Sequence, residues 1–387
     1  MTFALLIPND DLCVPLPGSK TLERVLGAAL RSSLGREILA FGPGHVTGAE
    51  RKREVARIAT DIRRVLKEEP GALMSLARLP TVSTLFRCVR GADAQRRDAL
   101  AGEIVATLGL ELGLAGLLRE PLRVTRPPAE ILALGARRRI RLPNATDEVV
   151  IECDGTVGPN AEADEPFHEV APSIALSLAD NNPMRMIEAH PDKEGNAIDL
   201  GGKTIDEWRA ALQAALSLIH AHLPAFRREI DLLLRQLVPV GFFPESHLSA
   251  SYQEAIGTVY LSLHPSPLTM AEAIVHEVSH NKLNALLSLA PLIENDPSEV
   301  YTSPVRPDPR PIHGVLLAVH AFLPVEQLYK NMLEAGAEPG AAEIGRHLER
   351  VRALNRQGAE VLLAHGRPTQ VGRPTFEEIA RLTAGAP

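Results

Sequence analysis

Cysteine is scarce in this sequence. The three thiols, Cys13, Cys88 and Cys153, lie far apart in the chain and form neither a CxxC pair nor the spacing of a zinc knuckle. A protein that depends on disulfides or on thiolate metal ligands needs paired or closely spaced cysteines. The sequence therefore excludes a disulfide framework and a thiolate metal site, and a reducing cytoplasm is the expected location.

Positive charge and long apolar runs are lacking as well. The 48 Asp and Glu residues outnumber the 41 Lys and Arg residues, which gives a net charge of −7, whereas nucleic-acid binders carry a positive field. No stretch reaches the roughly 20 apolar residues that span a bilayer. No basic segment precedes the short apolar run at the N-terminus, so it does not resemble a secretory signal. We expect neither nucleic acid nor a membrane as a partner.

The chain has enough apolar material for a large core. It holds 387 residues, 45% of them hydrophobic, which is typical of two to three globular domains. The first third is predicted to be helical, because Val55, Ile58 and Ile62 follow helical spacing until Pro70 ends the pattern. A second apolar stretch, residues 98–120, contains repeated small residues and predicts a helix that packs closely on its neighbours.

A second domain of mixed type is expected after the first third. Prolines interrupt residues 119–166, and short runs of strand-like composition follow. Strands are predicted in residues 173–180, 197–202, 237–243 and 255–263. The resulting prediction is an α+β fold, predominantly helical, with a helical N-terminal accessory region at residues 1–140 and a catalytic domain with a helical C-terminal extension at residues 141–387.

The strongest chemical signal is an HExxH motif formed by His276, Glu277 and His280 within a long apolar stretch that reads as a helix. Two histidines four residues apart lie on one face of a helix, where their imidazoles can converge on one divalent ion. The apolar neighbours predict that these side chains are buried, and a buried polar group without a partner is costly. We therefore predict a metal site at His276 and His280. Histidines satisfied by ordinary core hydrogen bonds are the alternative.

A third protein ligand has to come from elsewhere in the chain. The metzincin continuation would place a histidine at position 286, where this sequence has Leu286, so that family is excluded. His313 and His320, seven residues apart on a predicted downstream helix, return to almost the same face. We favour His320 because it lies in a buried run, with His313 as the alternative. A carboxylate such as Glu294 or Glu299 would instead make the site resemble gluzincin peptidases.

Two arginines precede that helix in a proline-rich segment, residues 306–311. Alternating prolines hold the backbone extended, so Arg306 and Arg310 are presented with little loss of entropy, and a guanidinium can bind a carboxylate through two hydrogen bonds. This predicts an anionic co-substrate beside the metal. A local ion pair between Asp308 and Arg310, which would only order the loop, is the alternative.

Small polar side chains alternate along a strand-like segment upstream of the motif. His247, Ser249 and Ser251 lie at every second position, so they share one face of an extended chain. We predict that they form a wall of the co-substrate pocket, with ordinary strand hydrogen bonding as the alternative.

Three segments in this order, HLSASYQEAIGTVYLSL, LTMAEAIVHEVSHNKLNALL and RPDPRPIHGVLLAVHAFL, resemble the HExxH domain of the aKG-HExxH-type peptide β-hydroxylases of bacterial peptide-modification clusters. The resemblance implies a non-haem Fe(II) oxygenase. Such an enzyme uses 2-oxoglutarate and O2 to hydroxylate a side-chain β-carbon of a ribosomally synthesised (RiPP) precursor peptide. His276, His280 and Arg310 match the family's motif, and Arg310 would hold the distal carboxylate of 2-oxoglutarate. His320 does not belong to the motif and remains inferred from helix geometry.

The role of Glu277 separates the competing hypotheses. In a zinc metallopeptidase, which an HExxH motif also indicates, Glu277 would be the general base for water. In the hydroxylase it would ligate the metal, orient a ligand or hydrogen-bond to an iron-bound species. A closed site with four protein ligands would indicate a precursor-binding scaffold with a structural metal.

Overall fold

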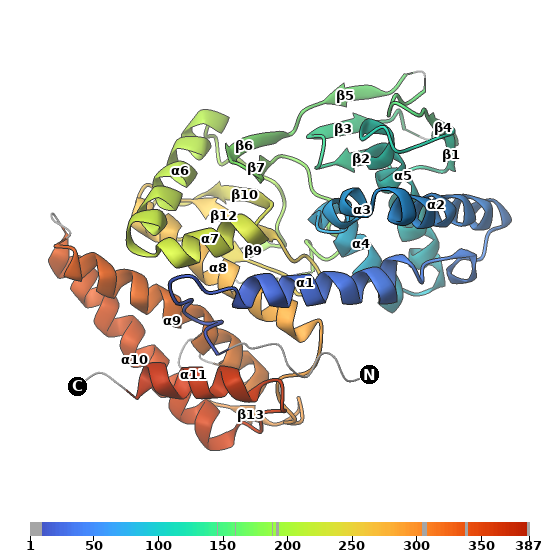
Figure 1. Cartoon of the computed structure of the whole chain (residues 1–387). Coiled ribbons are helices and arrows are strands. Elements are labelled where there is room, and N and C mark those ends of the chain that lie inside the picture. Colours follow the sequence, from blue (N-terminus) through green and yellow to red (C-terminus); the bar gives the residue numbers. More distant parts are fainter. Residues whose placement is uncertain are drawn as a thin grey trace.

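The computed structural model describes residues 10–144, 146–158, 160–187, 189–190, 193–303, 308–336 and 340–384. Helices make up 53% and strands 14% of the protein. Figure 1 shows an N-terminal helical part on one side and a mixed part with long C-terminal helices on the other. The predominantly helical α+β fold predicted from the sequence is confirmed.

The N-terminal part combines helices with small antiparallel sheets (Figure 1). Its helical segments are α1 (Thr21–Ser33), η2 (Leu34–Ile38), η3 (Pro43–His45), α2 (Ala49–Glu68), α3 (Pro70–Leu76), α4 (Pro80–Gly91) and α5 (Ala94–Leu114). Its strands pair as β1 (Leu122–Thr125) with β4 (Glu148–Ile151), and as β2 (Glu130–Ala133), β3 (Arg138–Arg141) and β5 (Glu162–Asp164). Helix α2 forms where the spacing predicts it: Val55, Ile58 and Ile62 are at most 1% exposed, and Pro70 begins the next helix.

Glycines let α5 lie close to its neighbours. A Cβ atom at Gly109 would lie 2.5 Å from the side chain of Leu122 on β1, and one at Gly113 would lie 2.8 Å from the backbone of Gly155. A side chain of any size would clash at either position, so the backbone approaches closely only because both residues are glycine. The close packing predicted for residues 98–120 is confirmed.

The later part is built on a five-stranded sheet in the order β11-β12-β10-β7-β6. The strands are β6 (Phe167–Ala171), β7 (Ile174–Ser177), β10 (Gln236–Phe242), β11 (Ser249–Ala250) and β12 (Thr258–Leu263). The three central strands are parallel, while β6 and β11 join antiparallel at the two edges. All six residues of β12 are buried, as expected for a parallel strand covered on both faces.

The same part of the chain contains helices α6 (Ile205–His222), α7 (Pro224–Leu233) and α8 (Pro267–Leu287). Helix α6 begins at a capping box, because the Glu207 amide donates to the Thr204 hydroxyl and the Thr204 amide donates to the Glu207 carboxylate.

The strand predicted at residues 197–202 is wrong: Asp199 forms only an isolated bridge to Val240. The chain turns away at Gly201, whose φ of +63° ends the extended run. The short pair β8 (Ala189–His190) and β9 (Lys193–Glu194) precedes it.

Three helices follow the sheet: α9 (Ile312–Glu334), α10 (Ala341–His365) and α11 (Arg373–Thr383). Figure 1 shows α9 and α10 running side by side, with α9 next to α8. The two-residue strands β13 (Val300–Tyr301) and β14 (Arg310–Pro311) pair just before α9. Within the described chain, α9 alone is long and apolar enough to cross a membrane, but 67% of its most apolar window is buried in the protein.

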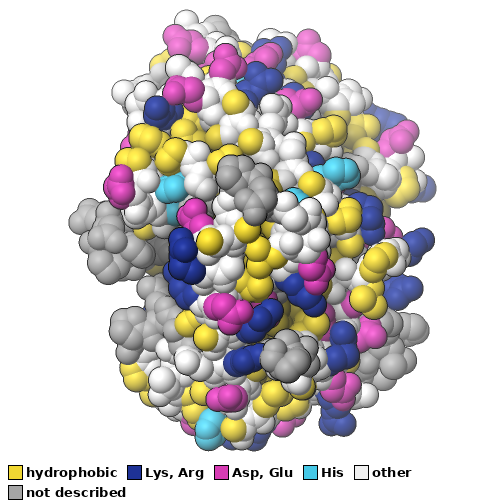
Figure 2. Space-filling view, turned by 90° about the vertical axis from the view of Figure 1, so that its left-hand side faces the viewer, with side chains coloured by type: hydrophobic (Ala, Val, Ile, Leu, Met, Phe, Trp, Pro, Cys, Tyr) yellow, Lys and Arg dark blue, Asp and Glu magenta, His cyan; other side chains and the backbone are white. Residues whose placement is uncertain are grey.

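Two large apolar clusters divide the core. The first spans residues 34–151. The second runs from Leu12 to Ile379 and includes Leu22 and Val25 of α1, so α1 packs with the later part of the chain. The division at residue 140 stays a prediction, and that residue lies within β3. On the face shown in Figure 2, basic, acidic and apolar side chains are interspersed.

Candidate metal centre

Helix α8 carries the HExxH motif as predicted. The Nε2 atoms of His276 and His280 lie 3.0 Å apart, and the two rings meet edge to face with centroids 4.6 Å apart. Burial lowers the pKa of His276 well below its usual range, and the neighbouring His280 adds to this effect. Burial also lowers the pKa of His280, although Glu277 opposes the shift. Both imidazoles are therefore neutral at neutral pH, which is the form that binds a metal ion.

The separation of the two nitrogens tests whether they fit a metal. Two nitrogen ligands at right angles on one ion, each about 2.1 Å away, lie about 3.0 Å apart, while a tetrahedral zinc angle separates them by about 3.4 Å. The observed 3.0 Å agrees with two adjacent ligands of one ion. It also suits a hydrogen bond between the rings, which is the alternative raised by the sequence. The buried Nδ1 of His276 has no hydrogen-bond partner in the described chain, so no outer partner fixes that ring.

Glu277 is held by two serines from the edge of the sheet. Ser249, on β11, donates its hydroxyl to Oε1 at 2.8 Å, and Ser251 donates to Oε2 at 2.7 Å. Glu277 is only 4% exposed, so these hydrogen bonds compensate the burial of its carboxylate. The two serines lie at the site, as the alternating pattern predicts, and they bind the motif glutamate.

The motif faces a pocket of about 390 Å³ between α8, β11 and the start of α9. Arg310, which ends the proline-rich segment, lines this pocket together with His276 and His280. Its Nε lies 2.8 Å from Asp308 Oδ2, and both side chains of this pair are more than a third exposed. Arg310 therefore lies beside the two motif histidines and also forms the alternative local ion pair. The remaining lining is contributed by Ser249, Ala250, Ser251, Glu277, Ser303, Gly314, Leu317, Ala318 and Phe322.

The structure does not bring His320 to this pocket. His320 does not line the pocket, although it lies near α8: burial, and then the charges of Lys282 and His280, lower its pKa well below its usual range. His320 is fully buried, and neither ring nitrogen has a hydrogen-bond partner among the described residues. His313, on nearly the same face as His320, does not line the pocket either.

No other third ligand is found in the part of the chain that the structure describes, where no group of three or more His, Cys, Asp or Glu side chains is placed to hold a metal ion. Glu299 does not line the pocket and accepts hydrogen bonds from Tyr301 and Arg367, and Glu294 is exposed. Neither supports the gluzincin arrangement.

Two further predicted residues stand apart. Arg306 lies outside the described residues. His247 does not line the pocket, and its ring lies 6.4 Å from that of His264. The predicted wall therefore consists of Ser249 and Ser251.

Two features at this centre escaped the sequence analysis. Phe322 packs its ring 4.5 Å from that of His276. Lys282, two residues after the motif, is fully buried and forms an ion pair with Glu229 at 2.5 Å. A lysine within an otherwise apolar helix is the signal that could have revealed this pair, because a buried charge needs a partner.

No model of a known protein family matches the chain, and no curated protein matches it in sequence. The class of the site therefore rests on its own geometry, an HExxH imidazole pair that shares a pocket with an arginine.

Proposed function

We propose that this chain is a non-haem Fe(II) and 2-oxoglutarate-dependent oxygenase that hydroxylates a side-chain β-carbon of a ribosomally synthesised precursor peptide in the cytoplasm. The observation that carries the proposal is the shared pocket of His276, His280 and Arg310. An imidazole pair suits Fe(II), and a guanidinium in the same pocket suits a dicarboxylate co-substrate. The sequence resemblance to the aKG-HExxH-type family leads to the same reading.

Each side chain has a distinct part in this proposal. His276 and His280 would hold the iron, and the guanidinium of Arg310 would bind the distal carboxylate of 2-oxoglutarate. When bound, iron with 2-oxoglutarate and O2 supplies the oxidising power needed to hydroxylate an unactivated carbon. The described chain provides two imidazoles, so we expect iron to bind weakly alone and more tightly with 2-oxoglutarate.

Glu277 is assigned a positioning role. Both of its carboxylate oxygens already accept a serine hydroxyl, which ties β11 to α8 and fixes one wall of the pocket. Each oxygen keeps a second lone pair, so the assignment rests on the wall that these two bonds hold in place and not on a lack of acceptor sites. Replacing Glu277 with Gln keeps the shape of the side chain, so we expect the variant to retain part of its hydroxylase activity.

Zinc-dependent peptide cleavage remains the second candidate, because the Glu277 carboxylate also lines the pocket beside the two histidines. The separation of the two nitrogens is closer to a right-angle arrangement than to the tetrahedral one of zinc. A zinc peptidase of the gluzincin type would also need a carboxylate as its third metal ligand, and neither Glu294 nor Glu299 lines the pocket.

The test is product analysis with a precursor peptide. Protein loaded with Fe(II) is given 2-oxoglutarate, O2 and the peptide, and the peptide is analysed by mass spectrometry while succinate is quantified. We expect the peptide to gain one oxygen atom and succinate to form in step, with both lost in His276→Ala. Cleavage of the peptide by zinc-loaded protein, abolished in Glu277→Gln, would instead establish the peptidase.

A further inference from the structure

A second polar pocket lies at the junction of the N-terminal part and the central sheet. It has a volume of about 310 Å³ and is formed by the α3–α4 connection, the β2–β3 turn, the start of β7 and the residue before β10. Three arginines line it, Arg78, Arg137 and Arg235, and no acidic residue does. We call it the arginine pocket. It shares no lining residue with the candidate metal centre.

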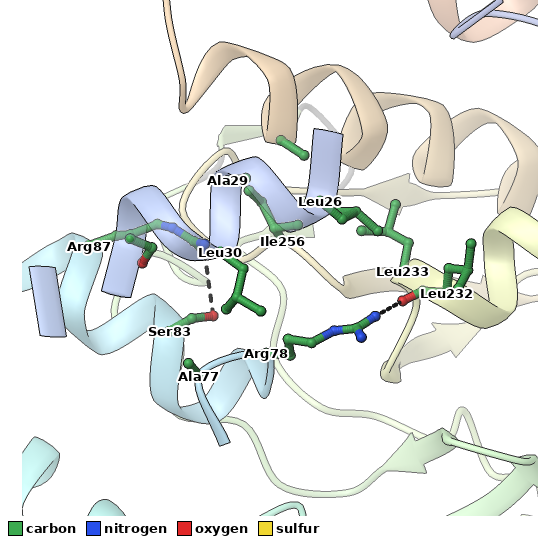
Figure 3. A pocket seen from close by; sticks show the side chains of 12 residues that line it. Leu26, Ala29, Leu30, Ala77, Arg78, Ser83, Arg87, Leu232, Leu233 and Ile256 are labelled. Atoms are coloured by element: carbon green, nitrogen blue, oxygen red, sulfur yellow. Dashed lines mark hydrogen bonds between the residues drawn. The ribbon is translucent and has the colours of Figure 1, made fainter. Parts of the chain in front are cut away.

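Two of these guanidiniums are held side by side. Arg78 Nη2 and Arg235 Nη2 both donate to the carbonyl oxygen of Leu232, at 2.6 and 2.7 Å. Figure 3 shows the Arg78 bond, with Arg78 also bordering a more apolar cavity beside Leu26 and Leu30. Because both groups share one acceptor atom, two positive charges are brought close together at the end of α7.

The carboxylate that acts on Arg235, Asp231, is itself paired with Arg227. Neither Arg78 nor Arg235 forms an ion pair with an acidic side chain of the described residues. Burial lowers the pKa of Arg235 to about 10; the positive charge of Arg78 contributes to this shift, and Asp231 opposes it. Arg78 is exposed and Arg235 only partly buried, so solvent screens part of their repulsion, and an anion between them would relieve the rest.

Arg137 adds a third guanidinium to the pocket. Arg137 is half-exposed and pairs with Glu169, outside the pocket lining. Arg137 and Ser173 both have positive φ values, +57° and +68°, which are costly for residues other than glycine. Nearby, the Gly135 amide donates a hydrogen bond to the Glu111 carboxylate, and burial raises the pKa of Glu111 to about 7.

We propose that the arginine pocket binds a doubly charged oxyanion, either a phosphate group or a small dicarboxylate. The planar fork of Arg78 matches the oxygens of such a group and retains N–H donors that the Leu232 carbonyl does not use. Arg235 donates from Nη1 to the Asp231 and Leu234 carbonyls and keeps its Nε and one Nη2 N–H for the anion. The mutual repulsion of the two arginines would be relieved by two negative charges. The proposal is independent of the reaction at the metal centre.

The test measures anion binding in a chain whose metal centre cannot hold a dicarboxylate. Arg310→Met protein is titrated calorimetrically with inorganic phosphate and separately with succinate, against chloride at equal ionic strength. We expect phosphate or succinate to bind and to raise the melting temperature, and which of them does so identifies the ligand chemistry. An effect no larger than that of chloride overturns the proposal.

Variants assign the binding to these residues. In the same background, Arg78→Gln should weaken binding at least about tenfold, because it removes charge-assisted hydrogen bonds. Arg78→Lys, which keeps the charge without the fork, should recover part of the affinity. Arg53→Gln, at an exposed position on α2, is the matched control and should bind like the parent. Circular dichroism checks that each variant is folded, and unchanged affinity in folded Arg78→Gln contradicts the proposal.

Discussion

Replacing Arg310 with Met tests the proposed co-substrate site. The substitution keeps an unbranched side chain of similar reach and removes the guanidinium. Charge-assisted hydrogen bonds contribute roughly 1.5–3 kcal/mol each, so losing a carboxylate contact should raise the dissociation constant for 2-oxoglutarate roughly 10- to 150-fold. The ion pair with Asp308 is exposed, so its loss should change stability by less than about 1 kcal/mol.

The assay is calorimetric titration of 2-oxoglutarate into anaerobic Fe(II)-loaded protein. Asp308→Asn is the control, because it removes the competing carboxylate and should bind 2-oxoglutarate at least as tightly as the wild type. Affinity for Fe(II) alone should be the same in all three proteins, since Arg310 is not a ligand. Equal affinity for 2-oxoglutarate in Arg310→Met and wild type would refute the assignment of this arginine.

Three further substitutions probe buried polar groups. Ser251→Ala removes a hydrogen bond to the buried Glu277 and should lower the free energy of unfolding by about 1–3 kcal/mol in urea titrations. Lys282→Met leaves Glu229 charged and buried without its partner, so we expect a loss of about 3–5 kcal/mol, which Lys282→Met combined with Glu229→Leu should largely restore. Glu111 has its pKa raised by burial from 4.5 to about 7, so its stabilising contribution is complete below pH 4.5 and is lost as the pH rises through 7. Relative to wild type, Glu111→Gln should therefore gain up to about 3 kcal/mol in unfolding free energy between pH 4.5 and pH 8, and a difference independent of pH would contradict this.

Local sequence patterns carried most of what could be predicted. The i, i+4 spacing of His276 and His280 determines their shared face wherever α8 packs, and strand alternation places Ser249 and Ser251 on one side. These relations need only the geometry of one element. The same holds for α2, where apolar spacing and Pro70 define the helix.

Relations between elements could not be predicted in this way. His320 was favoured because its neighbours are apolar, but burial does not tell whether the side chain reaches the pocket. In the fold His320 lies near Lys282 and His280 of α8 without lining the pocket. The packing of α1 with the later part of the chain is likewise a long-range contact with no local signal.

The coupling between metal and co-substrate tests the central claim most directly. Binding of 2-oxoglutarate is measured calorimetrically without O2, with and without Fe(II), in the wild type and in His276→Ala. We predict that Fe(II) tightens 2-oxoglutarate binding in the wild type and has no effect in His276→Ala. Binding of 2-oxoglutarate that is equally tight with and without Fe(II) in the wild type would contradict the account.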